Sequence, residues 1–107
     1  MDIQLKRGYL EICILASMLS GETYGYKLIR DVSKYIELSE STLYPILKRL
    51  ETAGCVSCRS AEYKGRLRKY YSITDSGRER IAEFMKDWET VYSVYNYIKE
   101  AYENDKK

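Results

Sequence analysis

The chain has 107 residues, of which 45% are hydrophobic, and a formal net charge of +2. This length allows one compact domain with one appended element and excludes a second independent domain. No apolar run approaches the roughly 20 residues that a membrane span needs, and no small-residue cleavage site follows the first apolar stretch. We therefore expect a cytoplasmic protein with no membrane partner.

Charge is divided unevenly along the chain. Residues 1–74 carry twelve Lys and Arg against eight Asp and Glu, whereas residues 75–107 carry six against eight. Cations placed against phosphates supply most of the affinity of proteins for nucleic acids. The local excess therefore favours a binding role for the front of the chain, and the small total charge does not argue against it.

Apolar spacing predicts the first two helices. Residues three or four apart form an apolar stripe from Leu5 to about Ser20, which is typical of a helix buried on most sides. Ser20-Gly21-Glu22 interrupts the pattern, and Thr23 is a candidate N-cap for a second helix from about Tyr24 to Lys34. Gly25 inside that helix costs about 1 kcal/mol relative to alanine, so we expect it to permit close packing or the close approach of a partner.

The third predicted helix has the features of a DNA recognition helix. Either Ser39 or Ser41 can cap it, it ends near Ala53-Gly54, and Pro45 is expected within about its first turn. Short polar side chains at the leading end and nearby cations suit entry into the DNA major groove. The alternative for Ser39 is a cap with no other role. The candidate DNA contacts are Ser39, Ser41, Thr42, Tyr44 and Lys48, together with Tyr24 from the preceding helix.

Two alternating segments after this helix predict an antiparallel hairpin. They run from Cys55 to Glu62 and from Arg68 to Thr74, and the turn between them contains Gly65. The hairpin carries five cations and one carboxylate, so it is expected to hold the DNA backbone; the alternative is a solvated basic turn. The candidate contacts are Lys64, Arg66, Arg68 and Lys69. Three helices followed by such a wing predict a winged helix-turn-helix, a mainly α fold of the α+β class, as the DNA-binding domain of residues 1–74.

Residues 75–107 are expected to form a dimerisation helix. Thr74 is its predicted N-cap, and apolar residues then recur with spacings of three and four, as in a coiled coil. A helix of about 29 residues is too long to lie on so small a domain, and two-fold dimers are the commonest soluble oligomers. We therefore expect a homodimer whose interface includes Ile81, Phe84, Trp88, Val91, Tyr95, Ile98 and Tyr102.

Aromatic residues are concentrated on this last helix. Rings at Trp88, Tyr92 and Tyr95 would line the dimer interface, where a planar aromatic ligand could stack between them. A plain hydrophobic interface without a ligand is the alternative, because aromatic anchors are common in interfaces.

The sequence argues against catalysis and metal binding. Cys55 and Cys58 form a C-x-x-C, but residues three apart on a strand point to opposite faces, which suits neither a chelate nor a disulfide. The chain contains no histidine, and its carboxylates are scattered along charged helical faces. We therefore expect no enzymatic activity, no cofactor and no metal.

Several stretches resemble the PadR family of bacterial transcriptional regulators, and together they cover nearly the whole chain in the right order. They are Leu5-Lys6-Arg7-Gly8 with the helix after it, Tyr24-Gly25-Tyr26, Ser41 to Pro45 continuing through Lys48 to Glu51, and the wing segment from Gly65 to Gly77.

The resemblance implies a winged helix-turn-helix dimer that represses transcription and often releases DNA when a small molecule or a stress signal arrives. The single C-terminal helix is similar to that of the short-tailed subfamily, some members of which hold planar drugs between paired tryptophans at the dimer interface. Trp88, in Phe84-x-x-x-Trp88, matches that tryptophan by position. Leu67 stands where many relatives carry a proline in the wing.

We therefore expect a ligand-responsive repressor that binds a palindromic site in double-stranded DNA. The alternative function is a winged-helix module that docks another protein, which predicts no salt-sensitive affinity for duplex DNA.

Overall fold

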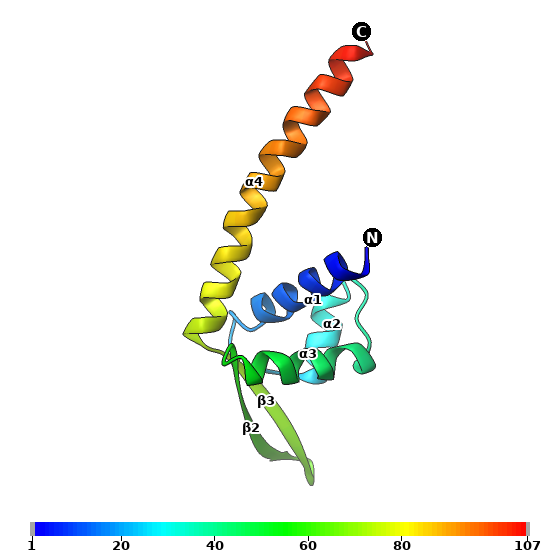
Figure 1. Ribbon diagram of the computed structural model, residues 1–107. Coiled ribbons are helices and arrows are strands. Elements are labelled where there is room, and N and C mark those ends of the chain that lie inside the picture. Colours follow the sequence, from blue (N-terminus) through cyan, green and yellow to red (C-terminus); the bar gives the residue numbers. More distant parts are fainter. Residues whose placement is uncertain (1, 107) are drawn as a thin grey trace.

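The computed structural model describes residues 2–106 and contains three body helices, a hairpin and a long C-terminal helix (Figure 1). The hairpin projects from one side of the body, and the C-terminal helix projects from the other. The predicted winged helix-turn-helix of the α+β class is confirmed. The elements are α1 (Ile3–Ser17), β1 (Thr23–Tyr24), α2 (Gly25–Val32), α3 (Glu40–Thr52), β2 (Val56–Tyr63), β3 (Arg66–Ile73) and α4 (Asp75–Asp105).

One apolar core unites the three body helices with the base of the hairpin. Ile14 from α1, Leu28 from α2 and Leu43 from α3 are fully buried in it. Cys55 and Val56 bring the start of β2 to the same core. Burying such side chains contributes roughly 1.5–3 kcal/mol each, so this core fixes the angle between α2 and α3.

The ends of the first helices differ from the predicted ones. Helix α1 begins two residues early, because the Asp2 carboxylate accepts hydrogen bonds from the backbone N–H groups of Gln4 (2.9 Å) and Leu5 (3.2 Å). Thr23 is not a cap: it is buried in the short strand β1, and Tyr24 occupies the N-cap position of α2. Pro45 lies deeper than predicted, as the sixth residue of α3.

The sheet has three antiparallel strands in the order β1-β3-β2. Strand β1 was not predicted, because two residues are too few to show an alternating pattern. It pairs Thr23 with Tyr71 and Tyr24 with Tyr70. The hairpin strands extend further toward the tip than predicted and are joined by the two residues Lys64 and Gly65, whose φ values of 51° and 81° are those of a type I′ turn.

Helix α4 is anchored at its first turns. The Thr74 hydroxyl accepts a hydrogen bond from the Gly77 N–H (3.2 Å) and donates one to the Gly54 carbonyl (2.6 Å), so the predicted N-cap is confirmed. One turn later, Arg80 forms an ion pair with Glu11 of α1. Beyond Trp88 every residue of the helix up to Asp105 is exposed, and the molecule is 66 Å long but only 25 Å and 22 Å wide.

The buried Tyr71 gives the fold a testable pH dependence. Burial, with the neighbouring Cys58, raises the pKa of Tyr71 from 10.0 to about 12. The unfolded chain therefore loses this proton first, and the stability contributed by the neutral ring is lost as the pH rises from 10 to 12. As the pH rises, we expect the unfolding free energy of Tyr71→Phe to fall less steeply than that of the wild type. The two slopes are expected to differ by up to about 1.4 kcal/mol per pH unit. Urea unfolding at several pH values from 9 to 12 measures this difference, and parallel curves would contradict it.

Candidate nucleic-acid interface

Helix α3 presents a polar and basic face to solvent. Ser41, Thr42, Tyr44 and Lys48 are exposed, whereas the apolar side of the helix is buried in the core. The Ser39 hydroxyl makes no capping bond to the backbone and lies 3.1 Å from the hydroxyls of both Ser41 and Thr42. The leading end of α3 is therefore a cluster of three hydroxyl groups, each able to donate to or accept from a polar partner.

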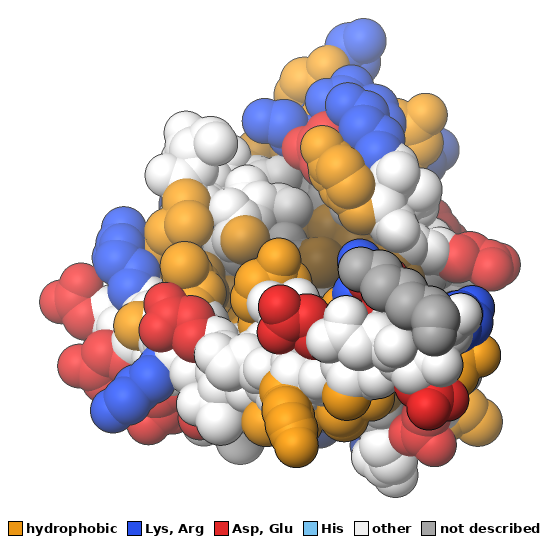
Figure 2. Space-filling view, turned by 90° about the horizontal axis from the view of Figure 1, so that it is seen from above, with side chains coloured by type: hydrophobic (Ala, Val, Ile, Leu, Met, Phe, Trp, Pro, Cys, Tyr) orange, Lys and Arg blue, Asp and Glu red, His pale blue; other side chains and the backbone are white. Residues whose placement is uncertain are grey.

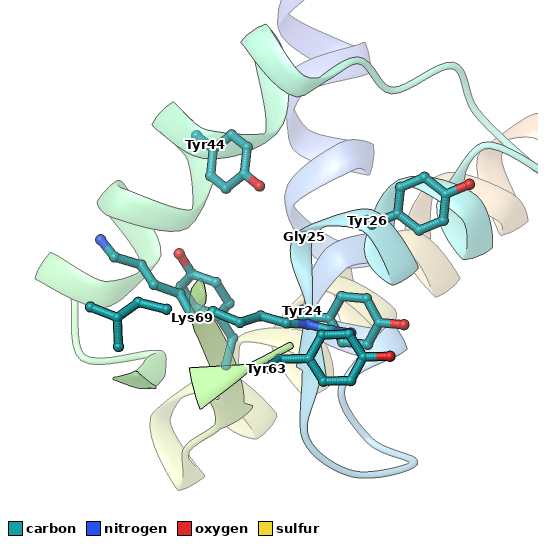
Figure 3. A pocket seen from close by; sticks show the side chains of 9 residues that line it. Tyr24, Gly25, Tyr26, Tyr44, Tyr63 and Lys69 are labelled. Carbon is teal, nitrogen blue, oxygen red and sulfur yellow. The ribbon is translucent and has the colours of Figure 1, made fainter. Parts of the chain in front are cut away.

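Tyr44 packs across the start of α2. A Cβ atom on Gly25 would lie 2.3 Å from the Tyr44 hydroxyl oxygen, so only glycine admits this approach. Figure 3 shows the Tyr44 ring reaching from α3 toward Gly25. The predicted close packing at Gly25 is confirmed, although this residue is the first of α2 rather than an interior one. Tyr44 thus braces the two helices while remaining 47% exposed.

A groove separates α3 from the wing. It has a volume of about 570 Å³, and its walls come from the start of α2, from α3 and from β3 (Figure 3). Lys69 and Arg68 contribute positive charge to it, and Tyr24, Tyr26 and Tyr44 contribute aromatic rings with hydroxyl groups. Such a surface offers hydrogen-bond donors and cations to a phosphate backbone.

The cations of the wing do not share one environment. Among residues 2–106, Lys64, Arg66 and Lys69 form no salt bridge and are exposed. Arg59 is instead held by Glu22 through two hydrogen bonds of 2.7 Å and 2.6 Å. The guanidinium of Arg68 lies over the ring of Tyr24. The Lys64 ammonium lies 5.4 Å from the centroid of the Tyr63 ring. Among residues 2–106, two of the five hairpin cations, Arg66 and Lys69, have neither a salt bridge nor a ring contact, so these two are available to a partner without breaking an internal contact.

The pKa shifts near the wing follow these contacts. Hydrogen bonding and charge from Arg68 lower the pKa of Tyr24 below its ordinary value, and the same contact raises the pKa of Arg68. Hydrogen bonding and charge from Arg59 lower the pKa of Glu22. The shifts of Glu22 and Arg68 favour the charged forms of these two side chains, so both stay ionised at neutral pH.

A second, apolar cavity lies between the start of α1 and α4. It encloses about 450 Å³ and is lined by Tyr9, Phe84, Trp88 and Val91, among others. The Phe84 and Trp88 rings are stacked with their centroids 6.4 Å apart, and the Tyr9 ring meets both edge to face at 5.8 Å. The predicted ligand residues Tyr92 and Tyr95 do not line this cavity.

The heptad residues of α4 remain uncovered in the single chain. Val91, Tyr95, Ile98 and Tyr102 have exposed fractions of 50% to 62%. Seen from above, hydrophobic side chains reach the surface between charged ones (Figure 2). Apolar rows of this length on exposed helices are typical of surfaces that pack against another molecule.

Two further observations concern metal-binding clusters and membrane-spanning helices. The three cysteines are free, and among residues 2–106 no cluster of three His, Cys, Asp or Glu side chains is placed to hold a metal ion. No helix in the same part of the chain is long and apolar enough to cross a membrane.

Comparison with known proteins identifies the family. Residues 14–83 match the model of the transcriptional regulator PadR-like family. The chain belongs to this PadR-like family. The transcriptional regulator Rv3488 of Mycobacterium tuberculosis is 31% identical over 75% of this chain and 76% of its own length.

Solved structures of similar proteins have the same fold. The structure of smu.1704 from Streptococcus mutans is 38% identical, with a TM-score of 0.77, and the match covers 88% of this chain and 89% of that one. Bacillus subtilis PadR, crystallised in complex with operator DNA, is 26% identical with a TM-score of 0.66 over 71% of this chain and 46% of that one. The resemblance to PadR regulators, drawn above from short motifs, is confirmed.

Several residues of this PadR-like chain were missed by sequence reasoning. Tyr9 lines the apolar cavity, and its only signal was its place on the apolar stripe of the first helix. Glu22, Tyr63 and Tyr70 hold the wing arginines. Glu22 is distant in sequence from Arg59, and its neighbour β1 pairs with β3 beside the hairpin. Tyr63 and Tyr70 meet their arginines through the pairing of β2 with β3.

Proposed function

We propose that this PadR-like regulator represses transcription as a homodimer that binds a palindromic operator. In this proposal, residues 1–74 bind DNA and residues 75–107 form the dimerisation helix. The observation that carries it is the exposed polar and basic face of α3 beside a wing with free cations. The complex of Bacillus subtilis PadR with operator DNA supports it, because that protein has the same fold.

The two DNA-binding elements have different roles in the proposal. Ser39, Ser41, Thr42 and Lys48 at the exposed side of α3 read base edges and hold nearby phosphates in the major groove. Tyr24 and Tyr44 border the groove beside α3, where their hydroxyls reach the backbone. Lys64, Arg66 and Lys69 on the wing contact phosphates, which adds affinity without sequence preference.

Removing two wing cations tests this division. We expect Arg66→Gln/Lys69→Gln to weaken binding to operator and random duplex alike, because phosphate contacts do not depend on sequence. Each lost phosphate contact reduces the slope of log K against log salt by about one, so the double variant is expected to lose about two. Fluorescence anisotropy titrations over a range of salt concentrations measure the slope.

A matched control removes the same charge elsewhere. Arg78→Gln/Lys86→Gln changes two cations on α4, outside α3 and the wing. We expect this control to keep the wild-type slope. An unchanged slope in the wing variant, or an equal loss in both variants, would show that the wing does not bind phosphates.

The apolar cavity beside Trp88 is the proposed effector site. Stacked Phe84 and Trp88 rings present flat faces, and the cavity wall is almost entirely apolar, which suits a planar aromatic compound. A dimer partner that approaches α4 would close the cavity. Binding there changes the contacts of α1 and α4 and thereby alters DNA affinity.

Trp88 is the only tryptophan, so its fluorescence reports on this cavity directly. We expect planar aromatic cations or phenolic compounds to quench it in a saturable way. Phe84→Leu, which removes the stacked ring, is expected to lower the ligand affinity measured by this quenching several-fold, because stacked ring pairs contribute about 0.5–1.5 kcal/mol. No response across a chemically broad panel would favour a plain hydrophobic interface.

A further inference from the structure

One face of the wing carries a row in which arginine groups alternate with aromatic rings. Side chains alternate between the two faces of a strand, and the strand register puts Tyr24, Tyr70 and Arg59 on a common face. We call this set the arginine–tyrosine row. It consists of Glu22, Arg59, Tyr70, Arg68, Tyr24 and Tyr63.

Arg68 is the centre of the row. Its guanidinium carbon lies 3.4 Å from the centroid of the Tyr24 ring and 4.1 Å from that of the Tyr63 ring. A third ring, Tyr70, lies 5.4 Å away, and this ring is also covered by Arg59 at 4.8 Å. Guanidinium groups at these distances from ring faces are attracted by the ring electrons and stack on them.

These contacts span the point where the wing leaves the body. Strand β1 supports β3 only at Tyr70 and Tyr71, so the hairpin beyond them has no neighbouring strand on that side. Tyr24 directly precedes α2, whereas Tyr63 is the last residue of β2 before the turn. Arg68 therefore joins the distal part of the hairpin to the start of the helix-turn-helix.

The pairing of β2 with β3 places a small residue opposite Arg68 and puts Lys69 on the other face of the hairpin. Ala61 is the residue directly opposite Arg68, and its small side chain leaves space beside the guanidinium. Lys69 alternates to the other face, the face of the buried Tyr71, and takes part in none of the ring contacts of the row. Both cations border the groove beside α3, but only Arg68 is covered by aromatic rings.

We propose that Arg68 is a wing-positioning residue, whose guanidinium fixes the angle of the hairpin to α2 and α3 instead of binding a DNA phosphate. Its effect on DNA binding is indirect: it holds Lys64, Arg66 and Lys69 where the backbone of a DNA bound to α3 passes. This inference rests on the proposed DNA-binding function.

The test compares Arg68→Lys, Arg68→Gln, Tyr63→Leu and Lys69→Gln in the full-length protein. Lysine keeps the positive charge but lacks the planar group that stacks on two rings. Tyr63→Leu removes one ring near the tip, far from the core, and removes no charge; this ring is also the one that Lys64 covers at 5.4 Å. Two quantities are measured: the affinity for duplex DNA as a function of salt, and amide hydrogen exchange of residues 60–68 without DNA.

We expect Arg68→Lys, Arg68→Gln and Tyr63→Leu each to weaken DNA binding, by up to roughly tenfold, at an unchanged salt slope. The same variants are expected to speed hydrogen exchange in the distal hairpin. Lys69→Gln is expected to show the opposite combination: the slope of log K against log salt falls by about one, and hydrogen exchange in the distal hairpin is unchanged.

Two results would overturn the proposal. Wild-type affinity in Arg68→Lys, together with a slope lower by about one in Arg68→Gln, would make Arg68 a phosphate contact. Unchanged hydrogen exchange in both Arg68→Lys and Tyr63→Leu would show that the row does not hold the wing. If the wild type itself bound no DNA, the proposed function would fail, while the exchange measurement would still decide whether the row holds the hairpin.

Discussion

Replacing Ile98 with glutamate is expected to turn the proposed dimer into a monomer and to weaken operator binding by two to four orders of magnitude. Ile98 lies on the heptad row of α4, so the proposed dimer would bury two carboxylates, one from each subunit, in an apolar interface. Unpaired charges in such surroundings cost several kcal/mol each. The loss of operator affinity follows because linking two binding modules increases affinity by about 10²–10⁴-fold.

The neighbouring residue provides a sharp control for this variant. Tyr97 is 68% exposed and Ile98 is 60% exposed in the single chain, so exposure does not distinguish them. Tyr97 lies off the heptad row, and Tyr97→Glu is expected to remain a dimer. Sedimentation velocity and light scattering measure the mass of both variants. A dimeric Ile98→Glu protein would show that α4 does not pair through its heptad row.

Replacing Gly77 with alanine is the second substitution with a large expected effect. A Cβ atom at this position would lie 2.4 Å from the Cys55 carbonyl oxygen and 2.6 Å from the Ile73 side chain. The carbonyl is not free to move, because it accepts a hydrogen bond from the Thr74 N–H at 3.0 Å. The first turn of α4 must therefore shift away from the body, which strains its contacts with α1.

We expect Gly77→Ala to destabilise the protein by about 1–3 kcal/mol through overpacking, although alanine favours a helix over glycine by about 1 kcal/mol. A change of this size lowers the melting temperature by roughly 4–8 °C for each kcal/mol in a chain of this length. Ser76→Ala is the control, because Ser76 is exposed in the same helical turn and is expected to change stability by less than about 0.5 kcal/mol. Thermal unfolding compares the two. A Gly77→Ala protein as stable as the wild type would mean that the tight packing at this position is absent.

The helices and the hairpin were predictable because their signals are local. The apolar spacing of α1 and the heptads of α4 repeat over many residues. Thr74 is the N-cap of α4, and a short local motif predicts it. Helix ends were predicted less accurately, because the start of α1 depends on a single capping side chain, that of Asp2. Strand β1 was missed because its two residues are defined only by their partners in β3.

The sequence predicted which residues form the candidate DNA-binding surface better than it predicted how those residues contact one another. The exposed polar face of α3 follows from helical spacing alone. The environment of Arg68 does not, since it depends on Tyr24 and Tyr63, which reach it from two other strands. Of the three candidate ligand residues, Trp88 lines the apolar cavity beside α1, whereas Tyr92 and Tyr95 are exposed further along α4. Tyr9, which lines the cavity from α1, was not among the candidates.

The measurement that tests the central proposal most directly is DNA binding by the purified protein. The duplex upstream of its own gene is compared with random duplex of equal length, at two salt concentrations. The proposed repressor is expected to bind the upstream duplex preferentially and to lose affinity steeply as salt increases. Weak binding to both duplexes with no salt dependence would contradict it and would favour a winged-helix module that docks another protein.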